Sequence, residues 1–544
     1  MTQLPNIQNK FCFGLIYADD KPNDWELGCY EKLREAGVIK NSVWLSLASL
    51  SHSDIKESPL DIILAFTELS HVEAANLAAN HGIWQFRFGG SLSNKSFGLR
   101  EVVLNSVTQE VTLEMLSKGA NRHSILRRGY FKTHGASLSK HRQSTLAQCT
   151  SWPAELAVEL AQTNHIQTQG FHDRKKSGAI SQILNHALLM AWPACAFYRK
   201  GMRLVKSFLR AFTYQQWNIG IIDAPISELL KTNRSFDIHW LPRPKWPLCL
   251  ADPFPIQYRG QNYVMAEQYD FLTVRGSITA LKLNSDLTID RPLRSLSFPF
   301  HVSYPCVVQN QDSLYCVLET LETNDLVIYR CENFPHMWSK FAVVQTGKPY
   351  ADPTLFQHEG RWWILATSYD QHSEGNSSLY AWHSPTIAGP WTPHLKNPVK
   401  IDVASSRSAG TPFSYEGRLY RPSQNCSVAY GGSVVINAIE TLTPTEFKEN
   451  RVVQVRPDSS YPDAFHHVAS FGNKTFVDGR RDLFFPLAAF TKFRHWFAHF
   501  GPSWLRPISN AIDPASLGWN TPTNTRVLRW EAASADLSTL KVLD

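Results

Sequence analysis

Apolar and polar segments alternate through the first 90 residues in a way that predicts a small α/β domain. Runs of apolar residues typical of buried strands occur at 11–17, 42–47, 60–66 and 82–88. Helical spacing of apolar residues occurs between them, at 24–36 and 72–80. Strands that alternate with helices favour a parallel sheet covered by helices, so we expect a parallel α/β domain over residues 1–150.

The next segment, 151–216, has a mainly helical pattern and is predicted to be a helical linker. Between 180 and 212, apolar residues are interspersed with Arg199, Lys200, Arg203, Lys206 and Arg210. A basic amphipathic helix of this kind can lie on an anionic membrane surface. A helix that bridges two domains and exposes a polar face fits the same pattern, so both interpretations stay open.

A repeated pattern then begins at Trp246 and predicts a β-propeller. Each copy has a proline that begins an apolar strand, a turn, and an aromatic residue that opens the next strand; the copies are 251–267, 303–319, 351–367, 410–424 and, more loosely, 466–480. A period of about 50 residues with four strands per repeat is typical of propeller blades. We therefore expect a five-bladed propeller over 217–482, with the strand 217–222 closing the ring.

The remaining residues, 483–544, form an aromatic and basic C-terminal segment. Residues 483–507 alternate Phe, Trp and His with Lys492, Arg494 and Arg506. Such a segment can sit at a membrane interface or pack against the folded domains. A further strand is predicted at 526–530.

Composition and charge limit the classes of protein to which this chain can belong. A chain of 544 residues exceeds one domain, and its net charge of +7 suits an anionic partner such as a phosphate group or an acidic membrane. We find no nucleic-acid-binding motif. The nine cysteines show no C-x-x-C pair, so neither zinc nor a disulfide framework is indicated. The polar start and the lack of an 18-residue apolar run predict a cytoplasmic protein, which could be peripheral at the inner face of the membrane.

The register of the repeat predicts which side chains line the central channel of the propeller. Carboxylates recur just before the proline and four residues after the aromatic; those predicted to be catalytic are Asp252, Asp352, Glu267 and Glu319. Carboxylates that meet at one channel mouth raise each other's pKa, which is typical of functional sites. The alternative is that each aspartate only caps a turn.

Other polar residues near the repeats are candidate ligands for a substrate. Arg407 and Arg421 flank one hairpin, and two arginines near a channel suit a phosphate or a carboxylate. The full set of predicted substrate-binding residues is Arg407, Arg421, Gln424, Tyr430, His301, Tyr304 and Asp270.

The propeller repeats resemble glycoside hydrolase family 43, the arabinanases and β-xylosidases. By that resemblance Asp252 corresponds to the general base and Asp352 to the aspartate that tunes the pKa of the acid. The general acid of the family has no counterpart, because the stretch 407–412 reads RSAGTP. Hydrolysis of a glycoside needs a proton donor for the leaving group, so it would require Glu267 or Glu319 in that role.

A closer resemblance is to the N-terminal region of plant glucosamine inositolphosphorylceramide transferases and their bacterial relatives. It rests on the stretches HVSYP at 301–305, ADPTLF at 351–356, 406–413, and YRPSQNCSVAY at 420–430. This resemblance implies a carbohydrate-related function for 217–482. The plant enzymes carry a separate glycosyltransferase domain after this region, and we expect no counterpart of it among the 544 residues of this sequence.

The first domain resembles the formyltransferase fold at 82–90 (GIWQFRFGG). The family places an Asn and a His on this strand, where this chain has Gln85 and Arg87. Formyl transfer needs the Asn and the His for polarisation and acid-base chemistry. We therefore expect a degenerate domain with a binding or scaffold role.

Together these patterns favour a glycosyltransferase that uses a nucleotide sugar and a glycan or lipid-linked acceptor. A phosphate leaving group needs positive charge rather than a proton donor, which fits the missing acid. A glycoside hydrolase and a non-catalytic glycan-binding module are the alternatives. No D-x-D motif is present, so no metal and no other cofactor is predicted.

Overall fold

The computed structural model describes residues 10–49, 60–69, 74, 77–89, 97–116, 122–173, 179–231, 236–284, 286–369, 375–486 and 488–489. Residues 72, 73, 75 and 76 of the predicted helix at 72–80, most of the aromatic segment 483–507, and the predicted strand 526–530 lie outside these residues; residues 77–80 are described and are not helical, so the predicted helix does not extend to 80. For 179–189 and 191, only the helical backbone is described.

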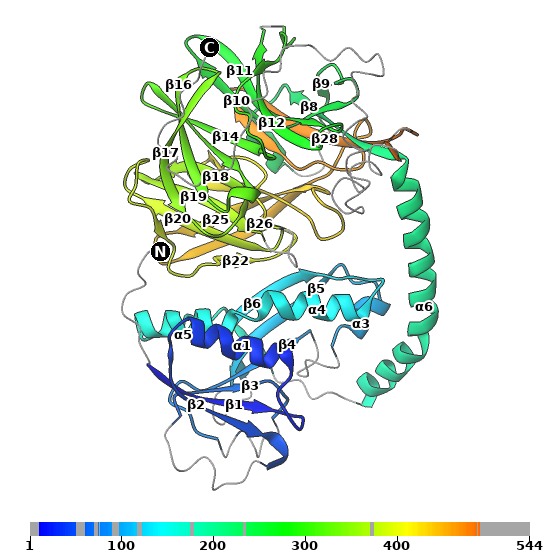
Figure 1. Ribbon diagram of the computed structural model, residues 1–544, viewed down its shortest axis with the longest axis vertical. Helices are drawn as coiled ribbons and strands as arrows, with labels where there is room; N and C mark the ends of the chain where they lie inside the picture. Colours follow the sequence, from blue (N-terminus) through cyan, green and yellow to red (C-terminus); the bar gives the residue numbers. More distant parts are fainter. Residues whose placement is uncertain are drawn as a thin grey trace, which may run out of the picture. The chain divides into compact units, whose positions relative to one another are not determined.

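The first domain contains one seven-stranded mixed sheet with the order β2-β1-β3-β4-β5-β6-β7 (Figure 1). Its strands are β1 (Phe11–Tyr17), β2 (Ile39–Ser46), β3 (Ile62–Ala65), β4 (Ile83–Phe88), β5 (Thr108–Leu116), β6 (Arg122–Lys132) and β7 (Phe171–Asp173). The four predicted strands, β1 to β4, are confirmed and pair in parallel as predicted, whereas β5, β6 and β7 are additional strands that the pattern did not predict. β5, β6 and β7 are joined by short connections or pair at the edge, and each runs antiparallel to its neighbour.

Helices cover this sheet because both of its faces are apolar. The helices of the region are α1 (Asp24–Glu35), α3 (Leu99–Val103), α4 (Leu138–Cys149) and α5 (Trp152–Thr163). Asn23 caps α1 through a capping box with Glu26, which fixes where this helix begins. Phe13 and Leu15 of β1 share one core with Leu33 of α1 and Trp152 of α5. α5 is therefore part of the first domain's core, and a single long helix, α6 (Ala179–Ala211), leads to the next strand.

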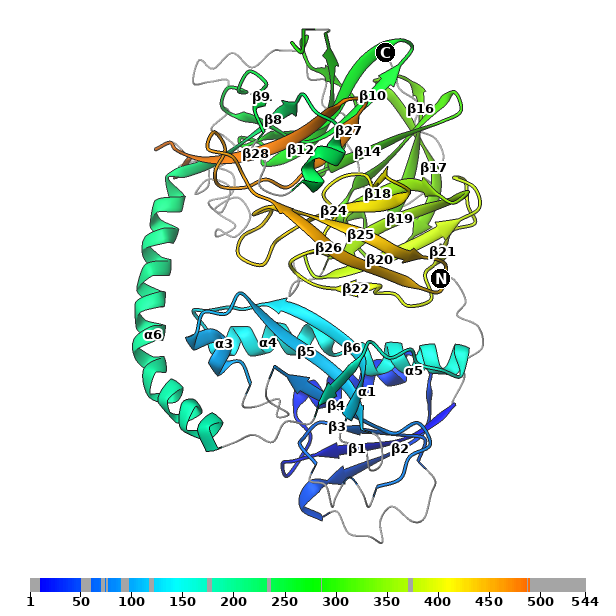
Figure 2. The ribbon, with the colours of Figure 1, turned by 180° about the vertical axis from the view of Figure 1, so that it is seen from behind.

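The described residues from 213 to 484 form five antiparallel sheets, which are the blades of the predicted propeller (Figures 1 and 2). The first is β10 (Leu248–Tyr258), β11 (Gln261–Asp270), β12 (Arg275–Leu283) and β13 (Leu293–Arg294). The second is β14 (Ser303–Asn310), β15 (Ser313–Glu319), β16 (Leu326–Asn333) and β17 (Met337–Gln345). The third is β18 (Tyr350–His358), β19 (Arg361–Ser368), β20 (Ser378–Ser384) and β21 (Thr392–Pro393), with β22 (Lys400–Ile401) also paired to β20. The fourth is β23 (Phe413–Tyr415), β24 (Arg418–Gln424), β25 (Val434–Leu442) and β26 (Phe447–Val455).

The fifth blade joins strands from both ends of the propeller sequence. Its order is β27 (Val468–Phe471), β28 (Lys474–Phe484), β8 (Thr213–Ile222) and β9 (Ile238–Trp240). β28 and β8 pair over ten residues, from Thr475 opposite Ile222 to Phe484 opposite Thr213. This pairing confirms that the strand containing 217–222 closes the ring.

Candidate functional site

Three blades place an unusual backbone conformation at the position before the proline. Asp252, Tyr304 and Asp352 have φ angles of 52°, 51° and 47°, in the left-handed region that non-glycine residues rarely adopt. At each of them the pairing of the innermost strand with the next is interrupted by a bulge. Left-handed residues of this kind cost on the order of 1–3 kcal/mol each and cluster at functional sites. The bulge turns these three side chains away from the regular alternation of the strand.

Each left-handed aspartate is held by a carboxylate from the preceding blade. The backbone N–H of Asp352 donates to Glu319 Oε2 at 3.0 Å, and that of Asp252 donates to Asp478 Oδ2 at 3.1 Å. Asp478 also accepts the N–H groups of His466 and His467 at 3.1 and 2.9 Å. The sequence analysis missed Asp478, although it lies in the fifth and loosest copy of the repeat. These bonds fix the two aspartates independently of any ligand.

Arg407 gathers several of the predicted residues into one cluster. Its Nε donates to Asp352 Oδ2 at 2.6 Å, and its Nη2 donates to Glu319 Oε2 at 3.1 Å and to Asp352 Oδ1 at 3.2 Å. Gln424 donates to the same Oδ2 of Asp352 at 2.6 Å. The Tyr430 ring lies over the guanidinium at 5.0 Å. Since Arg407 already forms an ion pair with Asp352 and a hydrogen bond with Glu319, the structure favours a counter-ion role over the predicted phosphate contact.

Asp252 faces a pair of histidines from the fifth blade. Its Oδ1 lies 3.8 Å from His466 Nδ1 and 3.6 Å from His467 Nδ1. His466 is also 2.7 Å from Asp478 Oδ2 and stacks on Trp217 of β8, with ring centroids 4.0 Å apart. The ring-closing strand therefore supports the wall of this site.

Burial and mutual repulsion shift the pKa values of these groups. Burial raises the pKa of Asp252 to about 7, with Asp352 and Asp478 adding to the rise and His466 opposing it. Burial also raises the pKa of Glu319 to about 8, although Arg407 opposes this. The pKa of Glu267 is raised well above its usual range by burial and by Asp252. At neutral pH the cluster therefore carries less negative charge than its carboxyl count suggests.

The two histidines respond in opposite directions. Burial lowers the pKa of His467 to about 4, so this ring is neutral at physiological pH. For His466, burial lowers the pKa, but Asp478 and Asp252 raise it by more, and the net shift is upward. The charged form of His466 is thus favoured beside Asp252.

Four other predicted substrate-binding residues have different surroundings: Tyr304, His301, Tyr430 and Asp270. Tyr304 is fully buried; its hydroxyl lies 2.9 Å from Thr354 Oγ1 and accepts the N–H of Gly410 at 2.8 Å. His301 accepts the N–H of Gly276 and lies 3.7 Å from Glu267. These two residues brace the channel.

Tyr430 is exposed, with its hydroxyl 3.4 Å from Arg407 Nη2, so it is placed to meet a ligand. Asp270 accepts the N–H of Leu272 at 2.8 Å, as a turn-capping residue does.

Arg421 lies in a separate, buried ion-pair cluster. Its guanidinium donates to Glu449 at 2.7 and 2.8 Å, and Lys400 donates to the same carboxylate at 2.6 Å. Burial would raise the pKa of Glu449, but Arg421 and Lys400 lower it to about 2. The side chains of Arg421 and Glu449 are each 1% exposed, so the structure gives Arg421 a structural role rather than the predicted contact with substrate.

One group of side chains has the composition of a cation site. Ligand atoms of Asp252, His466 and Asp478 lie within 4.8 Å of one another, and all three residues are buried. The same carboxylate of Asp478 already accepts three backbone N–H groups, which satisfies it without an ion. The donor set would suit a divalent cation, and the hydrogen bonds explain its arrangement equally well.

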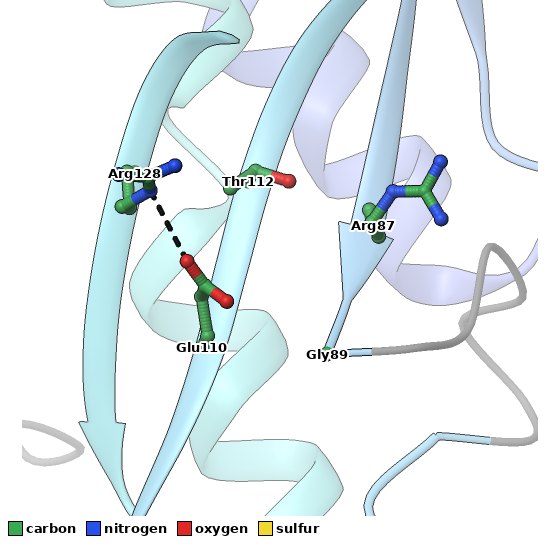
Figure 3. Close-up of a pocket in the computed structure, with 5 residues that line it drawn as sticks. All are labelled: Arg87, Gly89, Glu110, Thr112 and Arg128. Carbon is green, nitrogen blue, oxygen red and sulfur yellow. Dashed lines mark ion pairs between the residues drawn. The ribbon is translucent and has the colours of Figure 1, made fainter. Parts of the chain in front are cut away.

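The first domain has a small pocket of its own, of about 100 Å³ (Figure 3). It is lined by Arg87, Gly89, Glu110, Thr112 and Arg128. Arg87 Nε donates to Glu114 at 3.0 Å and Arg128 Nε lies 3.1 Å from Glu110, so each arginine has an acidic partner. Gln85 is buried and donates to the Thr67 carbonyl, which is a structural bond. Nothing in this geometry tests the predicted likeness to formyltransferases.

The strand order and the carboxylate cluster define the class: a five-bladed β-propeller in which buried carboxylates from four blades are gathered. Comparison with known proteins is more specific. Residues 246–463 match the family described as "Glucosamine inositolphosphorylceramide transferase 1, N-terminal". The predicted resemblance of the propeller region to this family is confirmed.

The curated relatives that match are plant proteins. Glucosamine inositolphosphorylceramide transferase 1 from Oryza sativa subsp. japonica is 34% identical over 204 residues, which are 37% of this chain and 27% of the relative. The Arabidopsis thaliana protein of the same name is 33% identical over 207 residues, again 37% and 27% of the two chains. The matching part thus spans about a quarter of the length of these relatives.

Solved structures with a similar course of the chain come from glycoside hydrolases. A family 117 glycoside hydrolase, Zg3597 from Zobellia galactanivorans, covers 50% of this chain and 91% of its own, with 10% identity and a TM-score of 0.33. An exo-β-1,3-galactanase from Phanerochaete chrysosporium covers 38% of this chain and 51% of its own, with 11% identity and a TM-score of 0.31.

Proposed function

We propose that this protein acts on carbohydrate at the mouth of the propeller channel, transferring a sugar from an activated donor to an acceptor hydroxyl. Asp252 is the general base in this proposal. Its carboxyl has a pKa of about 7, so near neutral pH it can accept a proton and remain an effective base. The observation that carries the proposal is the placement of Asp252, whose backbone N–H is held by Asp478 and whose Oδ1 lies 3.8 Å from His466 Nδ1.

The neighbours of Asp252 support this role. Its backbone N–H is fixed by Asp478, and its Oδ1 faces His466, which helps to hold the carboxylate in one orientation. Asp352 and Glu319 are bound to Arg407 and so are less available for proton transfer. Among Asp252, Asp352 and Glu319, Asp252 is therefore the carboxylate available for proton transfer.

An activated sugar donor fits a site that has no general acid in the expected place. The stretch 407–412, where a hydrolytic propeller would place its general acid, contains no acidic residue. A sugar phosphate bond breaks without a proton donor, provided that the departing charge is stabilised. The raised pKa values of Glu267 and Glu319 reduce the negative charge that an anionic donor would meet. The likeness to a family of transferases points to the same reaction class, with a phosphorylated glycolipid or glycan as the acceptor.

The test is a transfer assay with Asp252→Asn. Purified protein is incubated with a panel of nucleotide sugars and with acceptor mixtures of glycans and inositol phospholipids, and nucleotide release and product mass are followed. We expect turnover with one donor and a loss of about 10²- to 10⁴-fold in Asp252→Asn, as for removal of a general base. Asp290→Asn is the matched control, since this aspartate is exposed and pairs only loosely with Lys282 at 3.8 Å. Equal activity of wild type and Asp252→Asn would overturn the assignment.

A hydrolase is the second candidate, favoured by one observation. Glu319 has a pKa of about 8 and is therefore protonated at neutral pH, as a general acid must be. Release of free sugar from aryl arabinosides or xylosides, lost in Glu319→Gln, would support this reaction in place of transfer. Glycan binding that survives in Asp252→Asn without any turnover would indicate a binding module.

A further inference from the structure

Helix α6 has a charge composition unlike that of the rest of the chain. Its 33 residues include no aspartate or glutamate. Its basic residues all lie in the second half, at Arg199, Lys200, Arg203, Lys206 and Arg210. At 1.5 Å per residue the helix is about 50 Å long, so this half presents a continuous positive strip of about 18 Å.

From Met190 onward, α6 exposes a series of large apolar side chains, most of them in this second half. Phe197 is 84% exposed and Met190 85%, values at which the side chain is almost free of contact. The exposed apolar residues of α6 are Met190, Phe197, Tyr198, Met202, Leu204, Val205, Phe208 and Leu209. A single exposed apolar residue on a soluble protein is ordinary, but eight on one helix form a patch that needs a partner.

The apolar and basic residues occupy different sides of the helix. With 100° between successive residues, the eight apolar positions fall within an arc of roughly 160°. The five basic positions fall within a separate arc of roughly 120°. A helix with a wide apolar side and a purely basic opposite side is the pattern that lies flat in the interface of an anionic membrane.

Arg199 shows how the polar side is used within the protein. Its guanidinium donates to the carbonyls of Val103 and Gly135, at 3.0 and 3.2 Å. Arg199 and Phe197 lie on opposite sides of the helix, about 160° apart. The contact that anchors α6 through its basic side therefore leaves the apolar side facing away, while Lys200, Arg203, Lys206 and Arg210 stay exposed.

We propose that α6 is a membrane-binding element that inserts its apolar side into the surface of an anionic bilayer. Charge complementarity selects this occupant, because the basic residues border an apolar side that carries no acid. A second copy of the chain would bring two such basic borders together. Among the described residues, no helix is long and apolar enough to cross a membrane, so α6 would lie on the surface. This inference is independent of the reaction proposed for the propeller.

The test is sedimentation of the full chain with vesicles. Vesicles of phosphatidylcholine alone are compared with vesicles of equimolar phosphatidylcholine and phosphatidylglycerol, at low and at physiological salt. We expect binding to the anionic vesicles that weakens as salt rises. Lys200→Gln, Arg203→Gln and Lys206→Gln should each weaken it about fivefold.

Apolar insertion is tested by a second pair of variants. Phe197→Ser and Leu204→Ser should each reduce binding about tenfold or more, since each side chain would leave the bilayer. Met337→Ser on β17 is the matched control, because this residue is also exposed (53%) but lies on the propeller. Circular dichroism and the melting temperature verify that each variant is folded.

Several results would overturn the proposal. One is the absence of binding by the wild-type chain to anionic vesicles. Another is equal binding by Phe197→Ser, Leu204→Ser and the control. A dimer in size-exclusion chromatography that becomes a monomer in Phe197→Ser, with no vesicle binding, would instead identify a second copy as the occupant.

Discussion

Arg407 offers the sharpest test of how the channel cluster is built. Arg407→Met keeps most of the side-chain volume and removes the positive charge. Two carboxylates, Asp352 and Glu319, then lose a partner at 2.6 and 3.1 Å, and all three side chains are less than a tenth exposed. Breaking a buried ion pair in this way typically costs about 3–5 kcal/mol, because a buried charge is left uncompensated. For a domain of this size, we expect a fall in melting temperature of roughly 6–10 °C.

The measurement is thermal unfolding at neutral pH, followed by circular dichroism, with a second carboxylate variant to check the cause. Adding Glu319→Gln to Arg407→Met removes one of the stranded carboxylates, so the double variant should be more stable than Arg407→Met alone. Arg330→Met is the control, because Arg330 and Glu332 form an ion pair at 3.2 Å with both side chains more than 40% exposed. Its loss should cost less than about 1 kcal/mol.

The opposite outcome would refute the reasoning. If Arg407→Met melts with the wild type, Arg407 is not the counter-ion of Asp352 and Glu319. If that variant also loses binding of a nucleotide sugar, the role predicted from the sequence, a contact with the donor's phosphate, would be restored.

Three further predictions follow from single residues. The free energy of unfolding of the wild type should fall relative to that of Glu319→Gln as pH rises from about 4.5 to about 8. The reason is that the folded-state pKa of Glu319 is raised, so that its stabilising contribution belongs to the protonated form. Parallel pH profiles from urea unfolding would refute this. Glu449→Gln should lose about 3 kcal/mol at neutral pH and little near pH 2, because the pKa of Glu449 is depressed from 4.5 to about 2 and its contribution is lost as pH falls through that range; a pH-independent difference in the same urea experiment would contradict it. Gly410→Ala should prevent the propeller from folding or destabilise it by more than about 4 kcal/mol, since the φ of Gly410 is 124° and a Cβ would lie 1.9 Å from the Val468 carbonyl oxygen. Gly201 in α6 has open space around it, so Gly201→Ala should be neutral or slightly stabilising. Melting experiments on both variants measure the difference.

The propeller repeat could be predicted from the sequence because each blade has the same alternation of buried apolar residues on either side of a turn. Pro253, Pro305 and Pro353 start strands in equivalent places, and the spacing to the next aromatic residue is constant. The ring-closing strand was also accessible, since an apolar run at 217–222 has no partner within the repeats. In the first domain, strands β1 to β4 and their parallel direction could be predicted, but β5, β6 and β7 could not. The antiparallel pairing of β5, β6 and β7 depends on tertiary contacts that a period of two along the chain does not encode.

At the site, the positions of Asp252, Asp352, Glu319 and Gln424 followed from the register, but their partners did not. Arg407 and Arg421 look equivalent in sequence, yet one lies among channel carboxylates and the other against Glu449. The difference arises because Arg421 lies on β24, whereas Arg407 lies in the connection between β22 and β23. Asp478 was missed since the fifth copy lacks the proline that marks the others. The sequence of a single repeat does not reveal which carboxylates contact Arg407, because these contacts form only when the blades are assembled.

The pairing of β8 with β28 has a consequence for how the protein is made. The two strands are about 250 residues apart in the chain, so β8 leaves the ribosome long before its partner exists. During that interval its apolar residues, such as Ile219 and Ile221, have only the short edge strand β9 beside them. Bringing such distant segments together carries a loop-closure entropy that grows with the logarithm of the separation, and contacts of this range slow folding. We therefore expect the first four blades to form during synthesis and the ring to close last. Nascent chains that stop before 474 would hold an unpaired strand open to chaperones or to aggregation.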